Sequence, residues 1–282
     1  MDEITQPETS NAAVALPADP KPHNAGAALV SALIPGAGQF MLGEKLAGVV
    51  FFALDAVWAM LFLAFRLPRF YPGWWFVILS GLVLTIVASC QALRSRSEGR
   101  PPGHWIWLLG TLPLALISMI LFHTILLRAG GFRAFHIPST SMERTIQEGD
   151  VIMADMHFYR HHQPADGEII LMKSPNSPGV TVIKRLIAKG DDTIMSLDGK
   201  VSLNGADLNE SYVEHTGEPT DDLMNFGPLT IPPHKLFFMG DNRDISLDSR
   251  TPEFGLIDES AILGKALYIV APGHDRAGQR LH

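Results

Sequence analysis

Three long stretches with almost no charged side chains limit most strongly what this chain can fold into. The first, residues 47–65, contains Asp55 as its one charged residue, and residues 74–93 and 105–127 contain none. Each stretch is about 19 to 23 residues long, and an α-helix of ~20 residues crosses the roughly 30 Å hydrocarbon core of a bilayer. Tryptophans stand at the starts of the second and third stretches, where membrane proteins place an interfacial aromatic belt. The pattern predicts three transmembrane helices.

A fourth apolar segment, residues 27–42, is shorter and interrupted. Pro35-Gly36 and Gly38 break it, so it can be a short span, a re-entrant helix or an interfacial helix. The sequence around this break, Pro35-Gly-Ala-Gly-Gln39, favours a turn that serves helix packing. Residues 26–130 are therefore expected to form an α-helical membrane domain with three or four transmembrane helices.

Residues 1–25 are expected to form a disordered acidic tail. They contain four prolines, four acidic residues, one lysine and no aromatic residue. Such a segment buries too little apolar surface to offset the entropy of ordering. A secretory signal peptide is not expected there, because no basic region precedes an apolar core.

Positively charged loops set the predicted orientation. Residues 94–104 carry three arginines and a single acid, and short loops rich in lysine and arginine stay in the cytoplasm. The chain after residue 128 then lies on the outer face. Arg66 and Arg69 also lie outside in this arrangement and count against it. The side of the N-terminus depends on whether residues 27–42 span the membrane.

The pattern changes after residue 131 to short apolar or alternating segments separated by turns. Clusters of turn residues, such as residues 164–167 and Asn204-Gly205, bound these segments. Residues 131–282 are therefore expected to form a mainly β domain large enough for its own core. The interval between Lys184 and Asp241 is short, so an elaborate second β subdomain is not expected. The predicted strands are residues 151–156, 168–172, 180–188, 235–239 and 261–270.

Composition excludes several classes of function. The formal net charge of -7 provides no basic surface for nucleic acid. A single cysteine, Cys90, allows no intrachain disulfide and no multi-cysteine metal site. His157, His161 and His162 cluster in sequence, but neighbouring residues of a strand point to opposite faces. We therefore expect no metal, no other cofactor and no nucleic-acid partner.

One lysine of the β domain has surroundings that suit a general base. A serine hydroxyl becomes a good nucleophile only when a neighbouring base takes its proton, and the Ser139-Thr-Ser141 pair is weak evidence on its own, because serine is common in turns. Lys184 lies in a strand otherwise too apolar for a surface lysine. Burial would lower its pKa from about 10.4 and leave the neutral amine that a base requires. Taken alone, such a lysine is more often paired with an acid at a strand edge.

Three motifs together resemble one known family. They are Phe135-His-Ile-Pro-Ser-Thr-Ser-Met142, Val182-Ile-Lys-Arg185 and Met239-Gly-Asp-Asn-Arg-Asp-Ile-Ser-Leu-Asp-Ser-Arg250. Over residues 132–270 the chain resembles the bacterial type I signal peptidases, membrane-bound serine–lysine endopeptidases that remove signal peptides from exported proteins. The third motif is the most specific. The resemblance does not extend to the N-terminal spans, since the family usually has one or two.

The resemblance implies a mainly β catalytic domain of the signal-peptidase type that cleaves after small residues in an Ala-x-Ala pattern, without a cofactor. It implies a protein of the bacterial cytoplasmic membrane with its catalytic domain on the outer face, and the three predicted spans make that protein multi-pass. The expected partners are the signal peptides of exported preproteins, the lipid bilayer and the protein export machinery.

The resemblance also assigns roles to single residues. Ser141 would be the nucleophile and Lys184 the general base. Ser139 would donate its hydroxyl to the oxyanion together with the backbone N–H of Ser141, and Ser246 would orient the lysine amine. Residues that shape the site would be Asp241, Asn242, Arg243, Asp248 and Arg250, and residues that line the substrate pocket would be Ile137, Met142 and Ile183.

Three departures from the family pattern bear on substrate range and loop geometry. Arg144 stands where the family usually has proline, Glu168 where aspartate is usual, and the turn at residues 188–191 is one residue shorter and lacks a proline. Two other functions stay open: a dedicated maturation protease of one pilin-like substrate, and a non-catalytic membrane scaffold that binds extended peptides. A self-cleaving repressor is excluded. Such a protein has a DNA-binding helix-turn-helix and lacks membrane spans, whereas this sequence predicts three spans.

Overall fold

The computed structural model describes residues 25–94, 113, 117, 120–122, 124–218, 220–271 and 276–282. The predicted tail before residue 25, the loop after residue 94 and most of the predicted span 105–127 lie outside the described residues. The chain divides into two compact units, Met1–Asp55 with Leu82–Ser118 and Ala56–Gly81 with Met119–His282. The boundary runs through the helices α3 (Lys45–Phe65) and α4 (Tyr71–Arg94).

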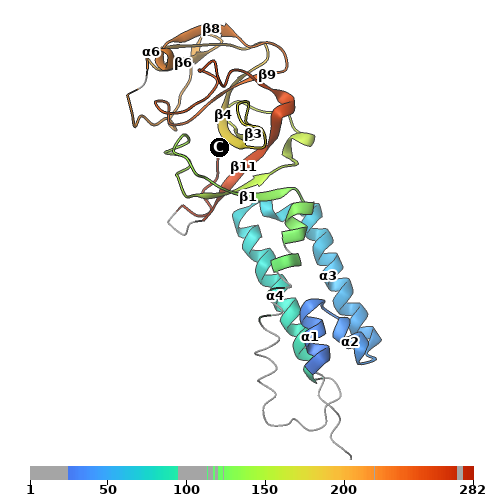
Figure 1. Ribbon diagram of the computed structural model, residues 1–282. Coiled ribbons are helices and arrows are strands. Elements are labelled where there is room, and N and C mark those ends of the chain that lie inside the picture. The colour runs from blue at the N-terminus through green and yellow to red at the C-terminus, as the bar shows by residue number, and fades with distance from the viewer. Residues whose placement is uncertain are drawn as a thin grey trace, which may run out of the picture. The chain divides into compact units, whose positions relative to one another are not determined.

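Helices form the N-terminal part of the described chain (Figure 1). α3 and α4 cover the predicted spans 47–65 and 74–93, and residues 27–42 form two short helices, α1 (Ala25–Leu33) and α2 (Ala37–Met41). Among the described residues, α3 is the one helix both long and apolar enough to cross a membrane; Ile78–Arg94 and Ile120–Ala129 are shorter apolar stretches. The other predicted spans stay predictions.

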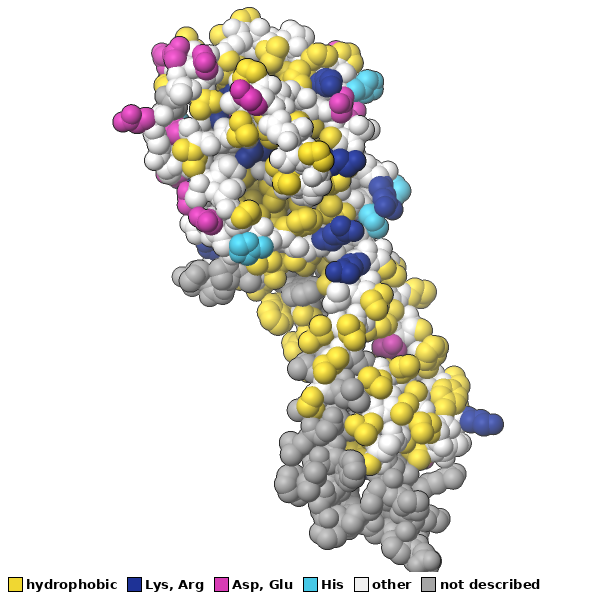
Figure 2. Space-filling model, in the orientation of Figure 1, with side chains coloured by type: hydrophobic (Ala, Val, Ile, Leu, Met, Phe, Trp, Pro, Cys, Tyr) yellow, Lys and Arg dark blue, Asp and Glu magenta, His cyan; other side chains and the backbone are white. Residues whose placement is uncertain are grey.

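The surface of the helical region is apolar. Figure 2 shows hydrophobic side chains over most of the visible part of it, with few charges among them. On α3, the side chains of Leu46, Phe52, Met60 and Phe65 are all exposed. Such a surface is unfavourable in water and favourable in hydrocarbon. α3 is therefore suited to contact with lipid.

A buried polar cluster holds α1, α2 and α4 together in the first unit. The side-chain amide of Gln39 is buried and donates to the carbonyl oxygen of Ala88 at 2.7 Å and to Gln91 Oε1 at 2.8 Å. Its oxygen accepts a hydrogen bond of 2.7 Å from Ser31. The Pro35–Gln39 turn therefore serves helix packing, as its sequence predicts.

The C-terminal part is the mainly β domain that the sequence predicts. Seven antiparallel strands form one sheet in the order β1-β2-β11-β3-β4-β9-β10. β3 is buried on both faces, with Ile170 and Met172 in one apolar cluster and Ile169 and Leu171 in another. Burial on both faces explains its unbroken apolar run. The strands are β1 (Phe132–His136), β2 (Val151–Asp155), β3 (Ile169–Lys173), β4 (Thr181–Lys189), β9 (Lys235–Met239), β10 (Ile257–Asp258) and β11 (Ile262–Ala271).

A second sheet fills the interval in which no elaborate second β subdomain was expected, so that expectation is wrong. Its strands, in the order β7-β6-β5-β8, are β5 (Thr193–Leu197), β6 (Lys200–Leu203), β7 (Ala206–Asp207) and β8 (Phe226–Thr230). Asp198-Gly199 and Asn204-Gly205 join the first three, with φ angles of 49°, 76°, 51° and 81°. Positive φ at both central residues is the type I′ turn that Asp-Gly and Asn-Gly favour. Short strands joined by such tight turns fit into this interval.

Short helices connect the strands of the β domain. α6 (Asp221–Met224) precedes β8, and the 3-10 helices η2 (Phe158–Arg160) and η3 (Glu259–Ala261) precede β3 and β11. A further 3-10 helix, η1 (Leu67–Arg69), lies in the turn between α3 and α4.

Candidate active site

The loop that follows β1 carries the predicted nucleophile. Ile137, Met142 and Ile146 of this loop are buried in the core of the large sheet. These apolar anchors leave Ser141 half-buried and Ser139 exposed. The hydroxyl oxygens of the two serines are 3.4 Å apart. The loop therefore presents two neighbouring hydroxyl groups at its surface.

Lys184 of β4 reaches this loop from 43 residues further along the chain, and its Nζ lies 2.6 Å from Ser141 Oγ. The lysine is 5% exposed. Burial lowers the pKa of Lys184 from 10.5 to about 8; the charges of Asp248 and Asp241 oppose this shift, and Arg250 adds to it. A lysine with such a pKa is partly neutral near physiological pH, and a neutral amine can accept the serine proton.

Two buried ion pairs fix the segment that follows β9. Asp241 accepts two hydrogen bonds from the Arg185 guanidinium, at 2.8 and 2.7 Å. Asp248 binds the Arg250 guanidinium through both oxygens, at 2.8 and 2.9 Å, and accepts the Gly240 N–H at 2.9 Å. Buried charges need such partners, because an unpaired buried charge costs several kcal/mol. The structure thus brings Asp241, Asp248 and Arg250 together beside the serine–lysine contact.

The same segment contacts the nucleophile loop through its backbone. The Asn242 N–H donates to the carbonyl oxygen of Ser141 at 3.2 Å, and the Asn242 side chain donates to the Thr216 hydroxyl at 2.7 Å. A Cβ on Gly240 would lie 2.4 Å from the Ser141 carbonyl oxygen and 2.2 Å from Ser246 Oγ. Glycine alone allows this close approach. Gly240 therefore belongs to the site, although the sequence prediction omitted it.

Ser246 does not make the predicted hydrogen bond. Its hydroxyl is buried and has no partner among the described residues. The Lys184 amine contacts Ser141 Oγ instead. A buried hydroxyl without a partner is unfavourable, and Ser246 lies close to Gly240 beside the nucleophile loop. A lysine-orienting role for Ser246 stays a prediction.

Arg185, Glu210 and Tyr212 complete the buried network, and the sequence prediction missed all three. The Arg185 guanidinium stacks 3.8 Å from the Tyr212 ring centroid. Glu210 accepts two hydrogen bonds from the predicted site residue Arg243, at 2.8 and 2.5 Å. Burial and the Glu210 carboxylate raise the pKa of Tyr212, which keeps the phenol neutral. The one available signal was at Arg185, a charge in an apolar strand directly after Lys184.

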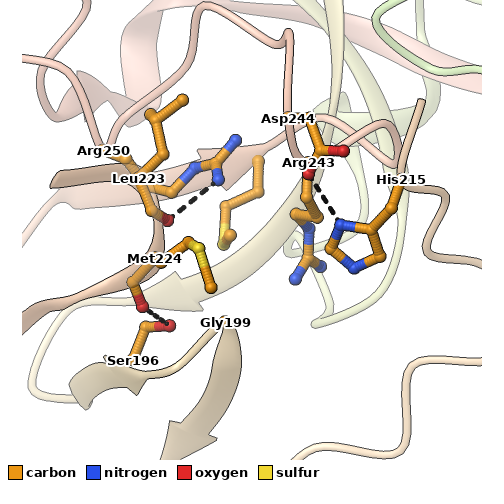
Figure 3. A pocket seen from close by; sticks show the side chains of 9 residues that line it. Ser196, Gly199, His215, Leu223, Met224, Arg243, Asp244 and Arg250 are labelled. Atoms are coloured by element: carbon orange, nitrogen blue, oxygen red, sulfur yellow. Dashed lines mark hydrogen bonds and ion pairs between the residues drawn. The ribbon is translucent and has the colours of Figure 1, made fainter. Parts of the chain in front are cut away.

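A small hollow of about 10 Å³ links this network to the second sheet (Figure 3). In its lining, Arg250 donates to the carbonyl oxygen of Leu223 at 3.1 Å. Next to this contact, Ser196 of β5 donates to the carbonyl oxygen of Met224 at 2.7 Å (Figure 3). Because both acceptors belong to α6, this helix connects the second sheet to the Arg250 ion pair.

A pocket of about 220 Å³ adjoins the serine–lysine contact. Its walls come from the end of β1, the nucleophile loop and the first half of β4, and they include Ser139, Ser141 and Lys184. The three predicted pocket residues, Ile137, Met142 and Ile183, all line it. Its mainly apolar walls suit apolar groups of a ligand.

Two of the three departures from the family pattern have local structural explanations. Arg144 has a φ of 75°, a left-handed conformation that proline cannot adopt. Its guanidinium donates to the carbonyl oxygen of Val213 at 3.2 Å. Glu168 accepts hydrogen bonds from Lys265 at 2.5 Å and from Tyr159 at 2.9 Å. Glu168 is thus held in a polar cluster of its own.

The fold and the site define a class of mainly β proteins in which a serine and a buried lysine meet beside an apolar pocket. Comparison with known proteins gives the family. Residues 108–271 match the family described as signal peptidase, peptidase S26. A probable signal peptidase I-1 of Synechocystis sp. is 31% identical over 185 residues, which are 63% of this chain and 89% of that protein. A signal peptidase I of Mycobacterium tuberculosis is 30% identical over 210 residues, 56% of this chain and 71% of that protein.

A solved structure is also similar to part of the chain. It is the crystal structure of a signal peptidase I from Enterococcus faecalis, 27% identical, covering 37% of this chain and 97% of that chain with a TM-score of 0.32.

The chain belongs to the signal peptidase S26 family, since the family match covers more than half of it. It is a signal peptidase I-type peptidase, and membership supports the cleavage of signal peptides by a serine protease. The resemblance noted from the three sequence motifs is thereby confirmed.

Proposed function

We propose that this protein is a membrane-bound endopeptidase that cleaves signal peptides from exported preproteins after small residues, with Ser141 as nucleophile and Lys184 as general base. The observation that carries the proposal is the 2.6 Å contact between Lys184 Nζ and Ser141 Oγ. Burial supports it, because it lowers the pKa of Lys184 toward the range in which a general base works.

The proposed reaction proceeds in two stages. Neutral Lys184 accepts the hydroxyl proton of Ser141 while Oγ attacks the scissile carbonyl carbon. The Ser139 hydroxyl and the Ser141 N–H donate to the resulting oxyanion. The C–N bond then breaks, and the Lys184 ammonium gives its proton to the leaving amine. In the second stage Lys184 takes a proton from water while the hydroxide attacks the acyl carbon. The ester C–O bond then breaks, and the Lys184 ammonium returns the proton to Ser141 Oγ, which restores both residues.

The pocket supports the preference for small residues. The chain around Ile137 and the strand around Ile183 face it together, and an extended peptide between them can add main-chain hydrogen bonds. The apolar walls then receive alanine-sized side chains at the first and third positions before the cut. Charged side chains would be desolvated there without partners.

The apolar helices support a membrane location. In this proposal the protein crosses the bacterial cytoplasmic membrane several times, and the arginine-rich loop 94–104 lies inside. The β domain then lies on the outer face, where a translocated signal peptide presents its cleavage site. Signal peptides and the bilayer are the partners, and the export machinery is a further one.

Cleavage of a preprotein by the full chain in liposomes tests the proposal. Ser141→Ala and Lys184→Ala should each remove cleavage at an Ala-x-Ala site. Lys189→Ala is the matched control, because Lys189 lies on the same strand with its side chain 44% exposed, and it should leave cleavage unchanged. Cleavage that survives Lys184→Ala would refute the mechanism. Cleavage of one preprotein from a varied panel would instead indicate a dedicated maturation protease.

A further inference from the structure

The turn between α3 and α4 contacts the large sheet within a single compact unit, Ala56–Gly81 with Met119–His282. Asp155, the last residue of β2, has a side chain that is 0% exposed. It accepts hydrogen bonds from Arg66 Nη2 at 2.5 Å and from Arg69 Nε at 3.0 Å. Two arginines from the helical turn therefore neutralise one buried carboxylate of the sheet.

Two neighbouring strands take part in the same contact. The Tyr268 hydroxyl of β11 donates to the carbonyl oxygen of Pro68 at 2.6 Å, and the Tyr71 ring packs edge-on against the Tyr268 ring at 5.7 Å. On β1, the Phe132 ring lies 5.1 Å below the Arg66 guanidinium. The turn thus rests on β1, β2 and β11, which are adjacent in the sheet.

The backbone of the turn depends on these contacts. Arg66 has φ 46° and ψ 45°, a left-handed conformation that is unfavourable for any residue with a Cβ. Such conformations persist where the surroundings hold them. A buried carboxylate is likewise unfavourable unless it is paired. The two unfavourable features, one on the turn and one on the sheet, are compensated by the same contact.

The paired strands β1 and β2 connect this contact to the active site. β1 pairs with β2 along its whole length, from Phe132 opposite Asp155 to His136 opposite Val151. The nucleophile loop begins where this pairing ends, and the N–H of Ile137 donates to the Asp150 carbonyl at 2.9 Å. One end of the β1–β2 hairpin therefore contacts the helical turn, and the other end holds the loop of Ser141.

We infer that Arg66 and Arg69, through Asp155, dock the catalytic domain onto the turn between α3 and α4 and so hold its pocket where it meets the cleavage site of a membrane-inserted preprotein. This inference rests on the proposed function. It gives the turn between α3 and α4 a functional role, and it makes these three residues positioning residues. It also requires residues 66–71 to lie on the same side of the membrane as Ser141.

Cleavage of two substrates by the full chain in liposomes separates positioning from chemistry. One substrate is a preprotein inserted in the same bilayer, and the other is a short soluble peptide with the same Ala-x-Ala site. The triple variant Arg66→Gln/Arg69→Gln/Asp155→Asn removes all three charges, so no buried charge is left unpaired. Its kcat/KM for the preprotein should fall about tenfold or more, since a displacement of ~1 Å can cost about 10²-fold. Its kcat/KM for the peptide should stay within about twofold of wild type.

Two control variants accompany the triple variant. Arg66→Lys/Arg69→Lys keeps both charges and should restore most of the preprotein cleavage. Arg133→Gln removes an exposed arginine of β1 and leaves the three docking residues unchanged, so it should behave as wild type. Equal losses on both substrates, or no loss on either, would overturn the inference. A wild type that cleaves neither substrate would instead refute the proposed function.

A labelling experiment tests, without any cleavage, whether the turn lies on the same side of the membrane as the β domain, as docking requires. Phe70→Cys in a Cys90→Ser background places a thiol at an exposed position of the turn. A membrane-impermeant maleimide should label it from the side on which the β domain is digested by added protease. Labelling from the opposite side alone would overturn the inference, whatever the enzyme cleaves.

Discussion

Replacing Lys184 with methionine should stabilise the folded β domain at neutral pH and remove its activity. Methionine has a similar length and volume, is apolar and adapts to irregular surroundings. Lys184 is buried, and its burial lowers its pKa from 10.5 to about 8. The substitution therefore removes a group whose charged form is disfavoured in the folded state.

The magnitude follows from the pKa difference between the unfolded and the folded chain. A shift from 10.5 to about 8 corresponds to a penalty of about 3.5 kcal/mol for carrying the protonated lysine into the fold, at about 1.4 kcal/mol per pH unit. The hydrogen bond to Ser141 is also lost, at roughly 1 kcal/mol. The free energy of unfolding should therefore rise by about 2.5 kcal/mol.

The sign of the effect depends on pH. The folded pKa of Lys184 lies below the unfolded value, so the unfolded chain binds this proton more tightly. The penalty is complete below about pH 8, shrinks as the pH rises from 8 toward 10.5, and is absent above it. The gain from Lys184→Met should follow the same course.

Denaturant unfolding of the β domain in the full, detergent-solubilised chain measures this gain at pH 7 and at higher pH. Lys189→Met serves as the control, because Lys189 lies on the same strand with an exposed side chain. Wild-type cleavage should rise about tenfold per pH unit up to about pH 8 and then level, as expected for a base with the pKa of Lys184. A Lys184→Met variant less stable than wild type at pH 7, or a pH-independent cleavage rate, would refute this reasoning.

Three other substitutions give separate tests of the site. Ser139→Ala should lower kcat about 10²-fold and leave KM nearly unchanged, as the loss of one oxyanion donor does. Single-turnover kinetics would measure this loss, and an unchanged kcat would contradict the oxyanion role of Ser139. Gly240→Ala should remove activity, because its Cβ would lie 2.4 Å from the Ser141 carbonyl oxygen. Arg144→Pro should destabilise the nucleophile loop, since φ is 75° there, whereas Arg144→Gly should not; equal melting temperatures would contradict this.

Regular patterns in the sequence predicted the large sheet well. The segments around Val151, Ile169, Lys184 and Lys235 all form strands. Their alternating or continuous apolar runs, bounded by turn residues, indicate strands with one or both faces buried. The second sheet was missed although its turns are visible in the sequence. Strands as short as Ala206–Asp207 carry too few residues for any periodicity, so the Asn-Gly and Asp-Gly turns were their only signal.

Only the site residues that belong to the family motifs could be predicted from the sequence. The proximity of Ser141 and Lys184 followed from the family resemblance, since spacing along the chain gives no distance in space. Glu210 and Tyr212 lie outside regular strands and contact Arg243 and Arg185 through the fold. Contacts of this kind have no local pattern, and they appear only when the tertiary structure is known.

Arg66 and Arg69, which counted against the predicted orientation, also have a partner that no local sequence pattern indicates. The positive-inside rule counts charges along the chain, and Arg66 and Arg69 count as free cations in it. Their partner, Asp155, is 89 and 86 residues away in sequence and 2.5 and 3.0 Å away in the fold. A buried carboxylate held between two arginines leaves this cluster with one net positive charge instead of two. In the proposed orientation, folding of the β domain on the outer face supplies the counter-charge, so these arginines weigh less against that orientation than their number implies.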